Sequence, residues 1–139
     1  MSMSRRYSEL IKLDSFMDRF EYLKLGGVVG ARTFGADRYL NQRLYTSKYW
    51  MTEVRPKIIV RDNACDLAHP LHDLHGFLII HHINPITKED IVNNSPLLYD
   101  PENLVVVSKF THEAIHYADA NLLLPLMTTE RKPGDTKLW

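Results

Sequence analysis

The chain has 139 residues, 45% of them hydrophobic, and its 17 basic side chains balance 17 acidic ones. This length accommodates one globular domain with a modest core, and no apolar run approaches the roughly 18 residues that a membrane span needs. Arg5-Arg6 is not followed by the apolar stretch of a secretory signal, so we expect a cytosolic protein. The single cysteine, Cys65, excludes an internal disulfide and any site built from several thiolates.

The charges sum to zero but are unevenly distributed along the chain. Residues 32–61 contain seven basic side chains against two acidic ones, and three tyrosines and Trp50 are interleaved with them. This pattern favours a surface that meets phosphates and sugars, with an ordinary solvated surface as the alternative. The candidate DNA-contacting residues are Arg32, Arg38, Arg43, Lys48, Arg55, Lys57 and Arg61.

The first part of the chain is expected to be mainly helical. Apolar residues recur every three to four positions over residues 7–25 and predict a helix, although Asp14 could cap a second, shorter one. The glycine-rich residues 26–35 predict a loop. A further helix is predicted from residue 46 or 47 to about Arg61, and Pro56 should kink it or end it early because proline lacks a backbone donor.

The second part of the chain predicts two strands followed by a helix. Residues 77–83, FLIIHHI, are short and β-branched and predict a strand. A brief capped helix is predicted over residues 87–94, a turn at 100–102 and a second strand at 103–107. Residues 109–119 then form a helix, so the fold class is α+β.

Four histidines on the predicted strand at 77–83 and the predicted helix at 109–119 indicate a metal site. His112 and His116 are four residues apart and project from one face of a helix. Neighbouring side chains of a strand point to opposite faces, so one of His81 and His82 can be a third ligand while the other addresses a substrate. Three protein ligands leave coordination positions open, as in catalytic metal sites, and this division of roles suits phosphodiester hydrolysis.

Residues 61–119 contain four short motifs in a fixed order: RDNACD, HHINP, NLVVV and HEAIH. In this order and on these predicted elements, the segment resembles the HNH endonucleases of the ββα-metal class, particularly small phage-associated members. The resemblance covers about 60 of the 139 residues. It implies a divalent-metal-dependent DNA endonuclease whose core is a two-stranded hairpin plus a helix, covered by N-terminal helices.

The resemblance also implies a role for each motif residue. His81 would ligate the metal and His82 would activate water as the general base, while Asn103 would brace the loop between the strands through backbone hydrogen bonds. His112 would be a second ligand, and His116 matches an additional ligand of the nuclease colicins. The cofactor would be one divalent ion, either zinc, nickel, manganese or magnesium, and the substrate double-stranded DNA; by ligand softness, three imidazoles favour zinc or nickel over magnesium.

The chain departs from the family in its cysteines. Many HNH proteins hold a structural zinc with two C-x2-C knuckles, but here Ala68 stands where a partner of Cys65 would be, and Ser108 and Thr111 replace the second pair. No structural zinc can form, so the N-terminal helices must stabilise the core by packing. The implied organisation is a helical N-terminal region with a basic DNA-facing stretch at 1–60, an HNH core at 61–120 and a C-terminal tail at 121–139.

Two other functions remain open. Residues 112–116, HEAIH, match the H-E-x-x-H pattern of zinc peptidases, in which Glu113 would be the general base. The His-His strand, Asn103 and the short helix count against a peptidase. The other alternative is a non-catalytic DNA-binding or phage-assembly module in which the metal only stabilises the fold.

A second group of histidines, His69, His72 and His75, precedes the predicted hairpin. These residues could form an accessory metal site, but Pro70 lies among them and a proline-containing loop preorganises ligands poorly. A polar loop is the favoured interpretation. Cys65 is expected to be a small buried residue rather than a nucleophile.

Overall fold

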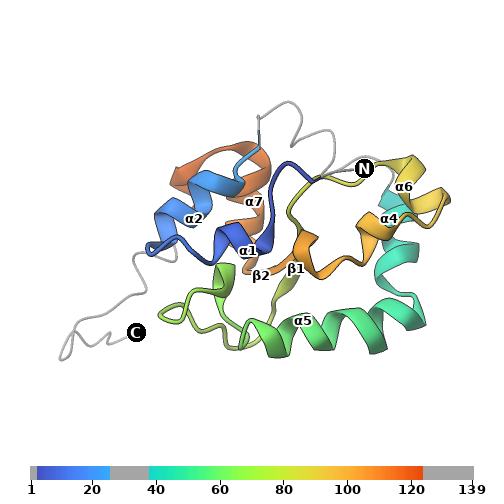
Figure 1. Ribbon diagram of the computed structural model, residues 1–139, viewed down its shortest axis with the longest axis horizontal. Coiled ribbons are helices and arrows are strands. Elements are labelled where there is room, and N and C mark those ends of the chain that lie inside the picture. The colour runs from blue at the N-terminus through green and yellow to red at the C-terminus, as the bar shows by residue number, and fades with distance from the viewer. Residues whose placement is uncertain (1–2, 26–37, 124–139) are drawn as a thin grey trace, which may run out of the picture.

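The computed structural model of the chain describes residues 3–25 and 38–123. It combines helices with a two-stranded antiparallel sheet, which is the expected α+β class (Figure 1). The predicted glycine-rich loop, Arg32, the side chain of Arg38 and residues 124–139 of the predicted tail lie outside the described residues. The first residues of that tail continue the fold as a 3-10 helix, Ala120–Leu123, and Leu123 is buried in the core. Across the described ranges, no helix has the length and apolar character that crossing a bilayer requires.

The sheet is a hairpin of β1, Ile79–His82, and β2, Leu104–Val107. The strands are antiparallel, with Ile79 opposite Val107 and His82 opposite Leu104. Both are shorter than predicted, because the ladder covers four residue pairs and Asn103 belongs to the turn before β2. All of β2 is buried, as expected for a strand covered on both faces.

One face of the hairpin packs against α7, Lys109–Tyr117, and the N-terminal helices. The Ser108 side chain caps α7 by accepting from the Thr111 backbone N–H, and the helix ends where Ala118 adopts a left-handed conformation. Val105, Val107 and Ile115 share a core with apolar residues of α1, Tyr7–Leu10, and α2, Phe16–Leu23, which lie on the left side of Figure 1. The N-terminal helices therefore contribute directly to the core beneath α7.

The opposite face of the hairpin packs against the middle of the chain. This half contains α4, Arg38–Tyr45; a π-helical segment, Trp50–Val54; α5, Arg55–Arg61; and α6, Lys88–Val92. Figure 1 shows α5 on the side of the strands away from α7. Trp50, Ile58, Ile80, Leu104 and Val106 are buried together in this second core. The hairpin is thus the middle layer between two apolar clusters.

The prediction of one helix over residues 7–25 is wrong, and the alternative of two helices is right. The segment forms α1, Tyr7–Leu10, and α2, Phe16–Leu23, and the cap of α2 is Ser15 rather than Asp14. The Arg19 side chain donates to backbone carbonyls in the linker between them, those of Ile11 and Leu13. These bonds satisfy carbonyl groups that a continuous helix would have paired internally.

The helix predicted to extend to about Arg61 does not end early at Pro56. Residues 48–61 are helical throughout, and the turn before α5 is a π-helix, Trp50–Val54. Pro56 falls in the first turn of α5, where a missing backbone N–H is tolerated. The change of helix type thus occurs immediately before the proline and absorbs its effect.

Buried hydrogen bonds link the segment before β1 to the start of α7. The Asp66 carboxylate accepts from the Ser108 backbone N–H at 3.0 Å and from the Thr111 hydroxyl at 2.7 Å. Asp66 is 1% exposed, so both bonds lie in a dry environment. Within the segment itself, the Cys65 thiol donates to the Asp73 carboxylate at 3.2 Å. The Asp66 bonds therefore hold the start of α7 against the segment before β1.

Candidate metal centre

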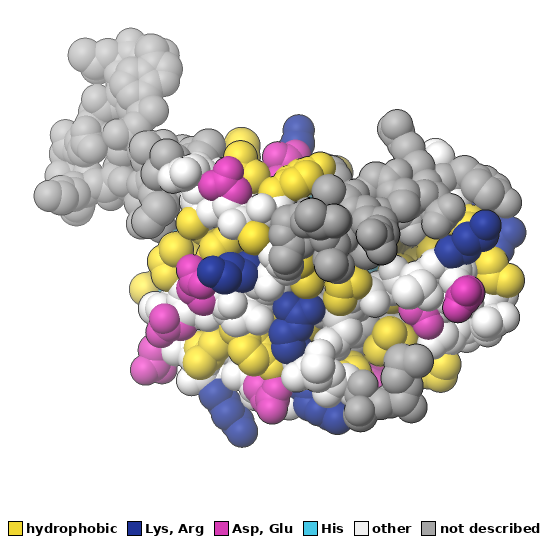
Figure 2. All heavy atoms as spheres, turned by 90° about the horizontal axis from the view of Figure 1, so that it is seen from above, with side chains coloured by type: hydrophobic (Ala, Val, Ile, Leu, Met, Phe, Trp, Pro, Cys, Tyr) yellow, Lys and Arg dark blue, Asp and Glu magenta, His cyan; other side chains and the backbone are white. Residues whose placement is uncertain are grey.

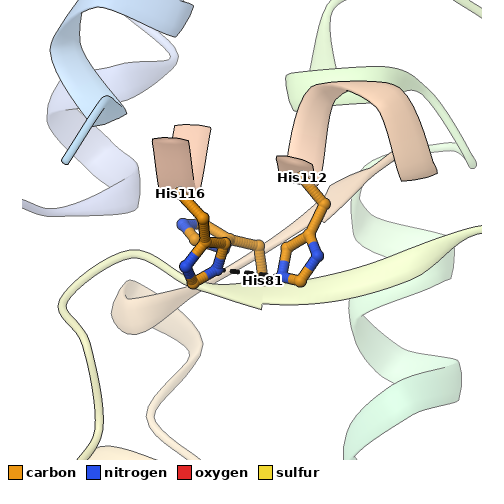
Figure 3. Close-up of side chains that lie close together, drawn as sticks. All are labelled: His81, His112 and His116. Carbon is orange, nitrogen blue, oxygen red and sulfur yellow. Dashed lines mark hydrogen bonds between the residues drawn. The ribbon is translucent and has the colours of Figure 1, made fainter. Parts of the chain in front are cut away.

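Three histidines from two elements converge on one point. His112 and His116 extend from one face of α7, and His81 extends toward them from β1 (Figure 3). The Nε2 atoms of His112 and His116 are 3.0 Å apart, and one nitrogen from each of the three rings lies within 4.8 Å of the other two. The i, i+4 spacing explains the helix pair. His81 joins them because it lies on the hairpin face that packs against α7.

Burial keeps these rings in the form that binds metals. His81 is 2% exposed, and burial together with the neighbouring His112 lowers its pKa well below the usual value for histidine. Burial, and then the proximity of His116, lowers the pKa of His112 to about 3. Both imidazoles are neutral at pH 7 and carry a lone pair on one ring nitrogen. Neutral imidazole is the protonation state that coordinates a metal ion.

The donor set fits a divalent metal ion. Among the described residues, Nε2 of His81 is a buried nitrogen without a hydrogen-bond partner, which is costly unless it is satisfied in another way. Tetrahedral zinc with Zn–N bonds of 2.0–2.1 Å places its ligand nitrogens roughly 3.3 Å apart. The observed separations of 3.0 Å and up to 4.8 Å bracket that value. These three histidines could therefore hold a metal ion with small side-chain shifts.

His82 is held on the other face of β1, next to Leu104 rather than Val105. Its Nε2–H donates to the Leu98 carbonyl at 3.0 Å, and its ring stacks on Trp50 with centroids 5.5 Å apart. A carbonyl can only accept, so this bond assigns the proton to Nε2 and the lone pair to Nδ1. Burial lowers the pKa of His82 to about 4. The ring is therefore neutral and oriented, as a general base must be.

The remaining nitrogen of His82, Nδ1, has a side-chain partner. The Tyr45 hydroxyl lies 3.2 Å from it. Burial raises the pKa of Tyr45 to about 12, so the hydroxyl keeps its proton and donates to the ring. A general base needs a nitrogen that water can reach, but here a tyrosine from α4 occupies that position.

Asn103 joins the two ends of the loop between the strands. Its Oδ1 accepts from the backbone N–H of Asn84 at 2.7 Å and from the Asn84 side chain at 2.8 Å, and its Nδ2 donates to the Leu97 carbonyl at 3.0 Å. Asn84 in turn binds the backbone of Arg5 through both its amide atoms. Asn103 is fully buried. It thus fixes the turn after β1 and links it to the N-terminal segment.

All four site histidines open onto one cavity of about 600 Å³. Its other walls come from the end of α4, the π-helical segment, β1 and the turn that follows β1. The described residues that line it are Asn41, Gln42, Tyr45, Trp50, Met51, Arg55, Phe77, Leu78, Ile79, Ile80, His81, His82, Pro85, Ile86, His112 and His116. Although His81 and His82 point to opposite faces of β1, a single cavity reaches both.

The predicted DNA-contacting cations differ in their surroundings. Arg43 and Lys48 are exposed, and Lys57 is exposed but paired with Glu53 at 3.6 Å. Arg55 lines the cavity, with one donor bound to the Leu78 carbonyl. Arg61 binds Asp62 and two backbone carbonyls and stacks on Tyr7, so its guanidinium has a structural function. On the face that Figure 2 shows, basic side chains are interspersed with acidic and apolar ones.

The histidines upstream of the hairpin have other partners. His69 Nε2 lies 2.8 Å from the Asp14 carbonyl and its Nδ1 accepts from the Leu71 backbone N–H, so both of its nitrogens are engaged. His72 stacks on Phe16 with ring centroids 4.1 Å apart. Within residues 3–25 and 38–123, His81, His112 and His116 are the one group of three side chains that could bind a metal.

Tyr45 and Trp50 belong to the site although sequence patterns placed them only on an aromatic, basic surface. They are 37 and 32 residues from His82, and no local period relates them to it. Asp66 was also missed, although it ends the RDNACD motif.

No protein-family model matches the chain, and neither a curated protein nor a solved structure matches it. Its function must therefore be inferred from the site itself.

Proposed function

We propose that this protein is a divalent-metal-dependent endonuclease of the HNH type that hydrolyses phosphodiester bonds of double-stranded DNA in the cytosol. The hairpin and α7 would be its ββα-metal core. The observation that supports this best is the convergence of His81, His112 and His116 beside the neutral, oriented ring of His82 in one cavity. A metal-ligand set with an adjacent base is what metal-assisted hydrolysis requires.

The roles of the residues follow from their positions. When bound by His81, His112 and His116, a divalent ion would supply Lewis-acid stabilisation of the phosphate charge. His82 would take a proton on Nδ1 from the attacking water, while Nε2–H stays on the Leu98 carbonyl and holds the ring. One P–O bond forms to the water oxygen and another breaks to release the leaving strand. Asn103 would keep the turn after β1 in place and touch no reacting atom.

Three imidazoles suit zinc or nickel better than magnesium, because softer ligands prefer softer ions. Manganese and magnesium remain in the proposal, since availability and turnover also select the ion. The ligand set leaves room for water or substrate, because a tetrahedral site has one position more than three protein ligands fill. The cavity of about 600 Å³ next to the ligands provides space for that position.

The decisive experiment measures nicking of a supercoiled plasmid with zinc, nickel, manganese or magnesium. His82→Ala should keep its metal content and slow nicking about a hundredfold or more, the usual effect of removing a general base. His75→Ala is the matched control, because His75 is exposed and lies outside the cavity lining. If the parent protein cleaves DNA with none of the ions, or if His82→Ala cleaves as fast as the parent, the assignment is wrong.

A zinc peptidase would use Glu113 instead of His82. Among the described residues that line the cavity and form the metal group, Glu113 is absent. Glu113→Gln should therefore leave nicking unchanged within about twofold, whereas it would abolish a peptidase. Casein digestion by the same preparations provides the complementary measurement.

The second candidate is a DNA-binding or assembly module in which the metal only stabilises the fold. The deep burial of His81 favours it, since closed sites are typical of structural metals. In that case metal removal would lower the melting temperature, and no ion would support nicking by the parent protein. Measurement of both properties on one preparation separates the two functions.

A further inference from the structure

We infer that the cavity beside the metal centre binds an unpaired nucleobase, so that the strand is cleaved where a nucleotide has left the duplex stack. This inference rests on the proposed nucleic-acid substrate and adds to it the conformation in which that substrate is bound. It depends on three observations: the depth of the ligand nitrogens, the size of the cavity and the chemistry of its walls.

The candidate metal ligands are deeply buried. His81 and His116 are 2% and 8% exposed, and the cavity is the space onto which both open. Its volume of about 600 Å³ is in the range of pockets that hold one small molecule. A single extruded nucleotide fits a site of this kind better than a stacked base pair does, as in enzymes that extrude the nucleotide on which they act.

The walls of the cavity are suited to a base more than to a phosphate. Arg55 is the one Lys or Arg among the described lining residues, while most of the others are apolar or aromatic. Phe77 and Met51 line the cavity and are nevertheless 76% and 50% exposed, so they are accessible to an entering group. Exposed aromatic rings stack on bases of any sequence. The Gln42 amide on the same wall can pair with a base edge.

Phe77 combines exposure with a place in the cavity lining. Among the exposed large apolar side chains that the structure describes, Met51 and Phe77 line the cavity, and Phe77 is the aromatic one of the two. Phe77 precedes β1 by two residues and so lies close in sequence to both His81 and His82. A base that stacks on Phe77 would place its own sugar and phosphate toward the histidines along the same cavity. The metal ion, the general base His82 and the ring of Phe77 would then face neighbouring parts of one nucleotide.

The test compares three fluorescent DNA duplexes that differ at one central position: fully paired, with one bulged adenine, and with one bulged abasic site. Binding is measured by anisotropy with the parent protein in the presence of a chelator, which prevents cleavage. The adenine bulge should bind at least about fivefold more tightly than the abasic bulge, as expected for stacking of one base. The two bulges share backbone charge and flexibility, so the difference isolates the base.

Phe77→Ala should remove that difference, and Phe77→Trp should restore it. Leu71→Ala is the matched control, because Leu71 is 84% exposed and lies outside the described cavity lining. Equal affinity of the parent for the two bulges would overturn the inference, as would a difference that survives in Phe77→Ala. Nicking of DNA without preference for the adenine bulge would overturn this inference and leave the nuclease standing. Base-dependent binding without nicking would support the base-binding site and refute cleavage there.

Discussion

The Tyr45 hydroxyl lies 3.2 Å from Nδ1 of His82 and donates to the lone pair that a general base would use. His82 cannot use its other nitrogen, because Nε2–H is bound to the Leu98 carbonyl. Tyr45 therefore occupies the place of the water that His82 would activate. It is the last residue of α4, which also carries the exposed cation Arg43. Under the proposed function, contact of α4 with DNA would be coupled to access to His82 through this one side chain.

Tyr45→Phe should raise the rate of plasmid nicking about twofold to tenfold. The substitution removes a hydrogen bond that competes with water for Nδ1, and a bond of this kind contributes about 0.5–1.5 kcal/mol. The phenyl ring keeps the contact with Trp50, whose ring centroid is 5.0 Å away. Single-turnover cleavage at saturating protein is the measurement. A loss of tenfold or more would mean that Tyr45 holds the ring of His82 rather than blocking it.

Replacement of His81, His112 or His116 by alanine should weaken binding of zinc or nickel at least about a hundredfold, more than the loss of an outer-shell partner costs. Each change removes one of three nitrogens that lie within 4.8 Å of one another. Isothermal titration calorimetry with zinc or nickel alone measures the affinity of each variant for the metal. His75→Ala should bind like the parent protein, and unchanged affinity in all three variants would place the metal elsewhere.

Asp66→Ala should lower the free energy of unfolding by about 2–3 kcal/mol. The change leaves the Ser108 N–H and the Thr111 hydroxyl without their buried charged acceptor. Urea denaturation of the metal-free protein measures the effect without a contribution from the metal. Glu89→Ala, an exposed acidic residue of α6, is the control and should change the value by less than about 0.5 kcal/mol.

The Cys65 thiol should react slowly with iodoacetamide at pH 8. Burial, and then the hydrogen bond to Asp73, raises its pKa to about 11. The thiolate, which is the reactive form, is then about two hundredfold scarcer at pH 8 than for an exposed cysteine with a pKa of about 8.5. Because the folded pKa is raised, the rate should increase tenfold per pH unit from pH 8 to 10. Rapid labelling at pH 8 in the folded protein would contradict the buried environment.

Charge reversal of Arg43 and Lys48 together should weaken duplex binding and reduce its dependence on salt. Both side chains are exposed, and each phosphate contact adds about 0.9 to the slope of log K against log salt. The double variant should lose up to about two units of that slope. Lys12→Glu, which reverses one exposed cation next to α1, provides the control for a single charge reversal away from α4. An unchanged slope in the double variant would move the contact surface away from α4.

Local periodicity was sufficient for the elements that carry the candidate metal ligands. The i, i+4 spacing of His112 and His116 on a helix is a property of neighbouring residues, as is the capping of α7 by Ser108. The two short strands were also predicted, because β-branched runs between turn residues have few alternatives. The helix boundaries near Ser15 and Pro56 were less predictable, since buried contacts and a π-helical turn decide them.

The sequence by itself determined the class of fold and three histidines suited to one ion. Only the tertiary structure decided what surrounds them, because Tyr45 and Trp50 meet His82 through packing of α4 and the π-helical segment on the hairpin. Likewise, only folding brings Asp66 to Ser108 and Thr111. Spacing along the chain encodes contacts within one helix turn, whereas contacts between elements depend on the burial of all the apolar faces together.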